Sequence, residues 1–323
     1  MEKILVTGAG GFIGSHLTEE LVKTGYNVKA LVRYNSGNRW GWLDTSEFKD
    51  DIEIITGDIR DYDSVRKAME GCESVFHLAA LIGIPYSYLS PLAYIKTNIE
   101  GTYNVLEAAK YLKINQVIIT STSETYGSAQ YIPIDENHPL VGQSPYSATK
   151  IAADSLALSY FRSFDLPVKV VRPFNTYGPR QSARAIIPST IIQILAGKKK
   201  IELGNLTPTR DFTFVKDTAK GFICIFNSDK LFGEVTNVGN SREISISDLI
   251  KLISELAGES EIVMKDERIR SEKSEVSRLL CDNKKLTRYT DWKPETKLRN
   301  GIIETIEFLR NNLDLYKSDI YNV

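Results

Sequence analysis

The feature that most constrains the fold is a run of glycines close to the start of the chain. The segment 3–17 reads KILVTGAGGFIGSHL, an apolar strand pattern followed by Gly8, Gly11 and Gly14 in GxxGxxG spacing and then a helical pattern. Between a strand and a helix, such glycines let the backbone turn tightly and approach a pyrophosphate, to which the helix N-terminus offers free N–H groups. The motif predicts a dinucleotide site that includes Gly8, Gly11, Phe12, Ile13 and Gly14.

The rest of the first half alternates short β-branched runs with helical stretches. The apolar runs include NVKALV, IEIITG, SVFHLA, QVIITS and VKVVR. This alternation predicts an α/β fold, a Rossmann-type doubly wound parallel sheet with helices on both faces. We expect residues 1–175 to form the dinucleotide-binding domain, joined by segments that return from the C-terminal half, and residues 176–323 to form mainly a smaller substrate-binding α/β lobe. In that lobe we expect a strand pair near 201–215 and helices near 186–197, 245–257 and 299–311.

Composition excludes several classes of protein. The 323 residues carry a net charge of -1 with no large basic block, which disfavours a nucleic-acid surface. No apolar run approaches the roughly 20 residues of a membrane span, and the first residues do not resemble a signal peptide, so we expect a cytoplasmic protein. Three widely spaced cysteines and three scattered histidines indicate neither a disulfide framework nor a metal site.

The ends of the next strands supply further cofactor candidates. The second strand ends at Arg33, where enzymes that use NAD usually place an acid for the ribose 2′-hydroxyl. A cation there suits a 2′-phosphate, so the sequence slightly favours NADP over NAD and leaves both open. Asp58, after the third strand, has a carboxylate that could accept the adenine amino group. The remaining candidates in these loops are Ile59, Leu78, Ala79 and Ala80.

A tyrosine and a lysine form the centre of a candidate catalytic site. Tyr146 and Lys150 stand four residues apart at the start of an expected helix, so they share a face. A nearby ammonium, together with a cationic nicotinamide, favours the phenolate and can bring the tyrosine pKa toward neutral pH. The YxxxK spacing becomes specific here because it follows the strand QVIITS of a dinucleotide fold.

These motifs resemble those of the extended short-chain dehydrogenases/reductases, in particular the nucleotide-sugar epimerase and dehydratase group. The resemblance extends over essentially the whole chain, through TGAGGFIG, GDIRD, FHLAA, NIEGTYNVLEAA, STSETYG, YSATK, RPFNTYGPRQ and TRDFTFVKD. It implies that Tyr146 removes the proton of the sugar C4 hydroxyl while hydride passes from C4 to the nicotinamide. It also implies that Lys150 binds the nicotinamide ribose, that Thr122 hydrogen-bonds the C4 oxygen, and that the protein is a homodimer, paired through the Tyr146 helix and its neighbour.

Residues 121–127, STSETYG, distinguish reactions within this group. Plain 4-epimerases lack a carboxylate here, whereas Glu124 can remove the C5 proton that a C4 ketone acidifies, so that water leaves from C6. Dehydratases that act on dTDP-glucose carry Thr-Asp-Glu, and Ser123 takes the place of that aspartate. GDP-mannose dehydratases are similar to this chain in carrying Thr-Ser-Glu, which leaves Glu124 as base and then acid. We therefore expect a 4,6-dehydratase with catalytic Thr122, Ser123, Glu124, Tyr146 and Lys150.

The resemblance also suggests contacts to a sugar-nucleotide substrate. Asn175 resembles the family's amide donor to the diphosphate, and Arg210 its phosphate-pairing guanidinium. Arg184, Arg270 and Arg278 are further candidates. The runs AALIGIPYSYLSP, GPRQSARAIIP and SEVSRLLCDN are most similar to the GDP-N-acetylglucosamine 4,6-dehydratases of legionaminic acid synthesis.

Three other functions stay open. UDP-glucuronate decarboxylases also carry STSEVYG and NTYGPR, but need a cation that faces the C5 carboxylate, and IGIPYSYLSP contains none. A 4-epimerase is disfavoured by Glu124. A non-catalytic sensor of nicotinamide or sugar nucleotides usually lacks the tyrosine or the lysine, and this chain has both. The nucleotide (GDP, UDP, dTDP or CDP), the sugar and the group that protonates the leaving C6 hydroxyl are also open.

Overall fold

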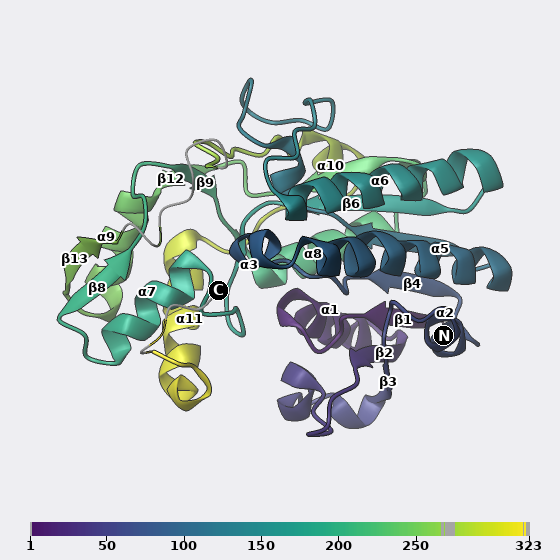
Figure 1. The fold of residues 1–323 in the computed structure, drawn as a ribbon, viewed down its shortest axis with the longest axis horizontal. Helices are drawn as coiled ribbons and strands as arrows, with labels where there is room; N and C mark the ends of the chain where they lie inside the picture. The colour runs from purple at the N-terminus through teal and green to yellow at the C-terminus, as the bar shows by residue number, and fades with distance from the viewer. Residues whose placement is uncertain (1, 266–267, 269–274, 319, 321–323) are drawn as a thin grey trace.

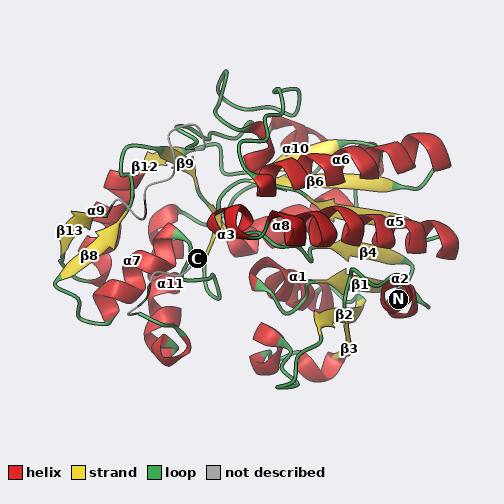
Figure 2. Ribbon diagram, viewed as in Figure 1, coloured by secondary structure: helices red, strands yellow, loops and turns green. Residues whose placement is uncertain are grey.

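A parallel sheet of seven strands forms the centre of the molecule. The computed structural model describes residues 2–265, 268, 275–318 and 320. The strands lie in the order β11-β6-β5-β4-β1-β2-β3, and every neighbouring pair is parallel (Figures 1 and 2). Their bounds are β1 Lys3–Thr7, β2 Asn27–Arg33, β3 Ile52–Gly57, β4 Ser74–His77, β5 Gln116–Thr120, β6 Val168–Pro173 and β11 Val235–Val238. The predicted doubly wound α/β fold is confirmed.

Helices cover both faces of this sheet because its strands are apolar on both sides. In β1, Ile4 and Val6 belong to the apolar core beneath α1 (Phe12–Lys23) and α8 (Val215–Phe226), whereas Leu5 belongs to the core on the other face. That second face is covered by α2 (Tyr62–Met69), α5 (Gly101–Leu112) and α6 (Pro145–Phe164). Among the described residues, no helix is long and apolar enough to cross a bilayer.

The chain between β4 and α5 forms short helical pieces instead of one regular helix. They are α3 (Ile84–Leu89), α4 (Pro91–Tyr94) and a π-helical turn, η3 (Ile95–Glu100), that leads into α5. The buried side chain of Asn98, in this turn, accepts from the backbone N–H of Leu81 and donates to its carbonyl and to Thr149. These bonds fix the segment after β4 against α6. The 3-10 turns in the described part of the chain are η1 (Gly41–Thr45), η2 (Lys49–Asp51), η4 (Ser123–Tyr126), η5 (Asp229–Leu231) and η8 (Leu313–Leu315).

A second group of elements lies beyond the carboxyl edge of the sheet and has its own apolar core (Figure 1). The helices predicted there are present as α7 (Ile186–Leu195), α9 (Ile246–Ala257) and α11 (Leu298–Asn311), and α10 (Lys284–Tyr289) packs near β11. The C-terminal half also returns α8 and β11 to the main sheet. The division of the chain at residue 175 stays a prediction.

The expected strand pair near 201–215 is wrong. The region contains β8 (Lys200–Leu203), β9 (Thr209–Asp211) and β10 (Thr213–Phe214), which do not pair with one another. Their partners are β13 (Glu261–Met264), β12 (Glu243–Ser245) and β7 (Thr176–Tyr177), respectively. For strands this short, tertiary packing decides which strands pair, and the local sequence pattern does not predict it.

Candidate active site

A large cavity opens where the strands of the sheet end. Its volume is about 1240 Å³, and its wall takes residues from the carboxyl ends of β1 to β6 and from the smaller lobe. In open parallel sheets, this edge is where ligands bind. The wall includes nearly all the candidates from the sequence, namely Gly8, Gly11, Phe12, Ile13, Gly14, Arg33, Asp58, Ile59, Leu78, Ala79, Ala80, Thr122, Ser123, Glu124, Tyr146, Lys150, Asn175, Arg184 and Arg210.

The glycine-rich segment from the end of β1 into α1 has no room for side chains at Gly8 and Gly14. Gly8 has φ +71°, and a Cβ there would lie 2.7 Å from the backbone nitrogen of Ala79. A Cβ on Gly14 would lie 2.2 Å from the carbonyl oxygen of Gly8. The turn therefore presents bare backbone to the cavity, and α1 begins without a side-chain cap on its N–H groups. These properties fit the diphosphate of a dinucleotide.

Arginines gather where β2 and β3 end. Arg33 and Asp58 are both on the cavity wall, together with Arg39 and Arg60, which the sequence analysis missed. The Asp58 carboxylate accepts from Arg60 Nε at 3.0 Å and Nη2 at 2.5 Å, and this pairing holds its pKa below the usual range. Asp58 therefore faces the cavity as an ionised group that is already bound to a cation. Its proposed contact with adenine is untested.

Tyr146 and Lys150 lie in the first turns of α6, which has well-defined N-terminal capping. The Ser144 hydroxyl accepts from the backbone N–H of Ser147, the Ser147 hydroxyl accepts from that of Ser144, and Pro145 occupies the first turn. Both candidate catalytic side chains are buried, at 7 % and 3 % exposure. The helix start therefore holds them rigidly against the cavity.

The electrostatic surroundings of Tyr146 differ from the simple expectation of a lowered pKa. Burial raises the pKa of its phenol, a hydrogen bond with Thr122 lowers it, and the charge of Glu124 raises it. The ammonium of Lys150 donates to the carbonyl oxygen of Thr120 at 2.6 Å, and burial lowers its pKa. In the protein alone the phenol is thus kept protonated, and its activation by Lys150 and a cationic nicotinamide stays a prediction.

Glu124 belongs to η4, the short turn directly after β5. Thr122 caps this turn, since its hydroxyl accepts from the backbone N–H of Glu124 at 3.2 Å. Ser123 is buried, whereas Glu124 is half-buried on the cavity wall. The charge of Glu124 raises the pKa of Tyr146, and both side chains are on the wall of the same cavity. The structure therefore places a carboxylate and a phenol at one site.

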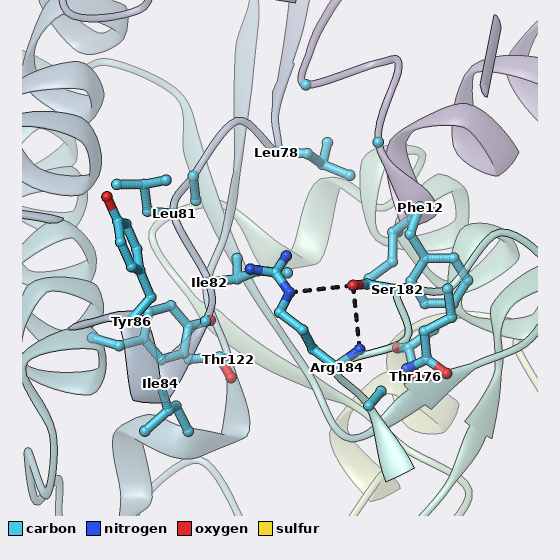
Figure 3. Close-up of a pocket in the computed structure, with 18 of the residues that line it drawn as sticks. Phe12, Leu78, Leu81, Ile82, Ile84, Tyr86, Thr122, Thr176, Ser182 and Arg184 are labelled. Atoms are coloured by element: carbon cyan, nitrogen blue, oxygen red, sulfur yellow. Dashed lines mark hydrogen bonds between the residues drawn. The ribbon is translucent and has the colours of Figure 1, made fainter. Parts of the chain in front are cut away.

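Three of the five candidate substrate residues line the cavity. Arg210 is buried, with Nη2 at 3.2 Å from the Glu275 carboxylate. The Oδ1 atom of Asn175 is buried and has no hydrogen-bond partner within the described part of the chain. Arg184 is exposed and reaches across the cavity toward Ile82, with Nε at 3.2 Å from the Ser182 hydroxyl (Figure 3). All three lie on segments that follow β6 or belong to the smaller lobe.

The structure does not bring Arg278 to the cavity. Its backbone bridges to Thr209 in β9, and its exposed guanidinium pairs with the Glu243 carboxylate of the adjacent strand β12. The expected substrate contact is therefore wrong for this residue, because strand pairing turns it toward the outer surface. Arg270 lies outside the described residues.

Comparison with known proteins identifies the family. The family model described as GDP-mannose 4,6 dehydratase matches residues 5–305. The chain belongs to this family. A putative UDP-glucose 4-epimerase of Methanocaldococcus jannaschii is 32% identical, with 96% of this chain and 99% of the relative covered. A UDP-N-acetyl-alpha-D-glucosaminuronate decarboxylase of Bacillus cytotoxicus is also 32% identical, with 96% and 98% covered.

Among solved structures, a dTDP-glucose 4,6-dehydratase from Streptomyces venezuelae with NAD bound superposes with a TM-score of 0.89. It is 26% identical, and the match covers 98% of this chain and 99% of that one. The chain is therefore an enzyme of the nucleotide-sugar dehydratase and epimerase family. Relatives of similar identity carry three different reaction names, so side chains of the site have to discriminate between the reactions.

Proposed function

We propose that the protein is a nucleotide-sugar 4,6-dehydratase. The observation that carries this proposal is that the carboxylate of Glu124 and the phenol of Tyr146 are both on the wall of one cavity. A nicotinamide dinucleotide held at the glycine turn supplies reversible oxidation of the sugar at C4. The chain itself has to move protons at C4, C5 and C6, and two buried or half-buried acid/base groups are present for that purpose.

Each proton transfer can be assigned to a side chain. Tyr146 removes the proton of the C4 hydroxyl, and Thr122, its hydrogen-bond partner, holds the same oxygen. Once C4 is a ketone, Glu124 removes the acidified C5 proton and delivers a proton to the departing C6 hydroxyl. Ser123 cannot take over the second task, because a hydroxyl is far too weak an acid. Glu124 therefore has to act first as base and then as acid.

The sugar nucleotide would lie between the sheet edge and the smaller lobe. Arg210, buried on the cavity wall, suits a diphosphate oxygen, and the side chain of Asn175 suits the same group through its amide. We propose GDP-N-acetylglucosamine as the substrate, a choice supported by the loop sequences around the cavity. A panel of GDP-, UDP- and dTDP-sugars tests this choice directly.

For the cofactor, we propose NADP in preference to NAD. Arg33 and Arg39 both line the cavity where β2 ends, whereas the nearby carboxylate of Asp58 is engaged by Arg60. Two cations in that region favour a 2′-phosphate. Calorimetric titration should then give tighter binding of NADP than of NAD, and an Arg33→Ala variant should reduce that difference. Equal affinities would refute the preference.

The activity test is the mass of the product. Incubation with GDP-N-acetylglucosamine should give a product about 18 Da lighter, the mass of one water. Glu124→Gln should still support C4 oxidation, seen as cofactor absorbance at 340 nm in a single turnover, but slow water loss by about 100-fold or more. Glu136→Gln, which changes a carboxylate that is not part of the described cavity wall, is the matched control. Normal dehydration by Glu124→Gln would refute the assigned base.

A second candidate function, decarboxylation of a nucleotide-linked uronate, is favoured by the position of Arg184. Decarboxylation was disfavoured because the segment IGIPYSYLSP contains no cation of its own. A Cβ on Gly83, in that segment, would lie 3.1 Å from Arg184 Nη1, so a cation from a later loop faces the segment. Loss of about 44 Da from UDP-glucuronate, as carbon dioxide, would establish this reaction in place of dehydration. Arg184→Met should then abolish it.

We also propose a homodimer that pairs through α5 and α6. Both helices carry large apolar side chains that are exposed in the monomer, including Tyr103, Tyr111 and Phe164. Contiguous exposed apolar surface is typical of protein interfaces. Light scattering after gel filtration should give twice the 36.3 kDa chain mass, and Tyr111→Glu should shift it toward the monomer.

A further inference from the structure

A buried aspartate lies one helical turn behind the lysine of the active site. Asp154 is 1 % exposed and stands four residues after Lys150 on α6. Its Oδ2 atom accepts three hydrogen bonds: from Ser121 Oγ at 2.7 Å and from Arg172 Nε and Nη2 at 3.0 and 2.9 Å. Arg172, on the adjacent strand β6, is also buried.

Such a group is costly to bury, and stability alone does not account for it. Replacing a buried ion pair by apolar residues is often neutral or stabilising, so its presence calls for another reason. The second oxygen of Asp154, Oδ1, is buried with no hydrogen-bond partner within the described chain. Arg172 and Ser121 therefore bind only one of its two oxygens.

The electrostatic effect of Asp154 falls on Lys150. Burial lowers the pKa of the lysine and thus favours its uncharged form, while the negative charge of Asp154 opposes this. The reaction needs the charged form, since only an ammonium stabilises a phenolate at Tyr146. Burial raises the pKa of Asp154, while the positive charges of Arg172 and Lys150 lower it, so the two cations favour the ionised carboxylate against the cost of burial.

Asp154 also fixes the end of β5 against α6. Ser121 donates to Asp154, and the preceding residue, Thr120, accepts from Lys150 through its carbonyl oxygen. The next residue, Thr122, hydrogen-bonds Tyr146. Three consecutive residues of the strand end are thereby joined to three positions of the helix, one turn apart. Displacement of Asp154 would disturb the register of Thr122 and Glu124 relative to the phenol.

We propose that Asp154, held by Arg172 and Ser121, is a positioning residue that keeps Lys150 charged and aligns the end of β5 with the start of α6. The proposal rests on the C4-oxidation step of the proposed function, which dehydratases, decarboxylases and 4-epimerases share. It does not depend on which of these reactions follows.

The charged and titratable groups around this carboxylate come from four elements. Lys150 and Tyr146 are on α6 itself, and Arg172 is on β6 with its guanidinium 4.8 Å from the centre of the Tyr126 ring in η4. His77 in β4 is fully buried, and the charge of Lys150 helps to lower its pKa to about 3, so it stays neutral over the working range. Tyr126 has a pKa raised by burial and likewise stays neutral. The charges that vary with pH are those of Tyr146 and Lys150.

Asp154→Asn tests the proposal through the pH dependence of C4 oxidation. The negative charge of Asp154 raises the pKa of both Tyr146 and Lys150. Removal of this charge should therefore move both limbs of the pH–rate profile, that of Tyr146 and that of Lys150, to lower pH by about one unit. The rate is read as single-turnover reduction of the bound cofactor. As an independent readout, the Lys150 pKa is measured by NMR on protein with 13Cε-labelled lysine, with Lys150→Arg to assign the signal, and should fall as well.

Asp217→Asn is the matched control. Asp217 is buried in α8 and accepts from the backbone N–H of Thr296 at 2.9 Å, on a part of the molecule that does not line the cavity. It should lower the melting temperature without moving either limb. Asp154→Glu, which keeps the charge, should keep the limbs in place even where the rate falls. Unchanged limbs and an unchanged Lys150 pKa in Asp154→Asn would overturn the proposal.

If Asp154→Asn does not fold, Ser121→Ala decides, because it removes only one hydrogen bond to the carboxylate. Because this bond lowers the pKa of Asp154, its loss should favour protonation of the carboxylate and shift the limbs in the same direction by a smaller amount. No shift would overturn the proposal. Failure of the dehydratase assignment has a different signature. The wild type would then reduce its cofactor with a sugar nucleotide but release an epimer or carbon dioxide, and the Asp154 comparison would still hold.

Discussion

A single methyl group added at Gly14 should affect both the stability of the fold and the binding of the cofactor, and the two effects can be measured separately. Gly14 lies in the first turn of α1, with its hydrogen atom toward the carbonyl oxygen of Gly8. In Gly14→Ala the new Cβ would start 2.2 Å from that oxygen, whereas a Cβ on Gly11 would lie 3.2 Å from the same atom. The helix would have to move away from the turn by about 1 Å to restore a normal contact.

The expected cost combines two opposing effects. Overpacking against backbone costs about 1–3 kcal/mol. Alanine regains about 1 kcal/mol over glycine inside a helix. We therefore expect Gly14→Ala to lower the free energy of unfolding by up to about 2 kcal/mol. The same shift moves the N–H groups of α1 away from a bound diphosphate, so cofactor affinity should fall by about 10-fold or more.

Urea unfolding and calorimetric titration with the dinucleotide measure the two effects separately. Gly11→Ala is the comparison for stability, because its contact is tolerable and its φ of -81° suits alanine. It should cost less than about 1 kcal/mol. If Gly14→Ala were as stable as Gly11→Ala and bound the dinucleotide like the wild type, the argument from close packing would be refuted.

Two further predictions concern buried basic residues. Lys169, buried in β6, donates to the carbonyl oxygens of Ile225 and Phe226 at the end of α8 and to the side chain of Gln116. Lys169→Met leaves these oxygens without a donor, so urea unfolding should show a free energy of unfolding lower by about 3 kcal/mol. A loss below about 1 kcal/mol would contradict this. Burial lowers the pKa of His16 to about 4, so its contribution is present above pH 6.5 and is lost as the pH falls toward 4. His16→Gln can keep the hydrogen bond to the Pro179 carbonyl but does not titrate. The free energy of unfolding of this variant should therefore fall less steeply over that pH range, by up to about 1.4 kcal/mol per pH unit. An unchanged slope would contradict the role given to His16.

The parts of the site that depend on local sequence could be predicted well. The glycine turn needs only a strand, a turn and a helix in succession, and Tyr146 and Lys150 share a helix face through their spacing alone. The structure places all of these on the cavity wall. Asp154 follows Lys150 at the next i+4 position, and this spacing could have indicated it. Its partner Arg172 lies on β6, so the pair itself could not be predicted from the helix spacing.

The parts that depend on distant segments could not be predicted in this way. Arg39 and Arg60 line the cavity because two loops return to the sheet edge. Arg184 meets Gly83 only because the loop after β7 lies across the cavity from α3. Arg278 was wrongly expected at the substrate for the same reason, since pairing with β9 decides where it points. No periodicity in the sequence carries such information.

Different residues of the cavity are assigned to the oxidation at C4 and to the step that follows it, which is how one fold can carry different reactions. Tyr146, Lys150 and Asp154 all belong to α6, which packs on the sheet, and in the proposed function they serve the oxidation at C4. Glu124 lies in the short turn after β5 and is half-buried, whereas Arg184 is exposed on a loop of the smaller lobe. A neutral C6 hydroxyl leaves Glu124 to act on C5, but a carboxylate at C5 would pair with a cation opposite it and lose carbon dioxide instead. In the proposed function, the substituent that the sugar carries at C5 therefore decides between elimination and decarboxylation, while the residues assigned to the oxidation at C4 stay the same.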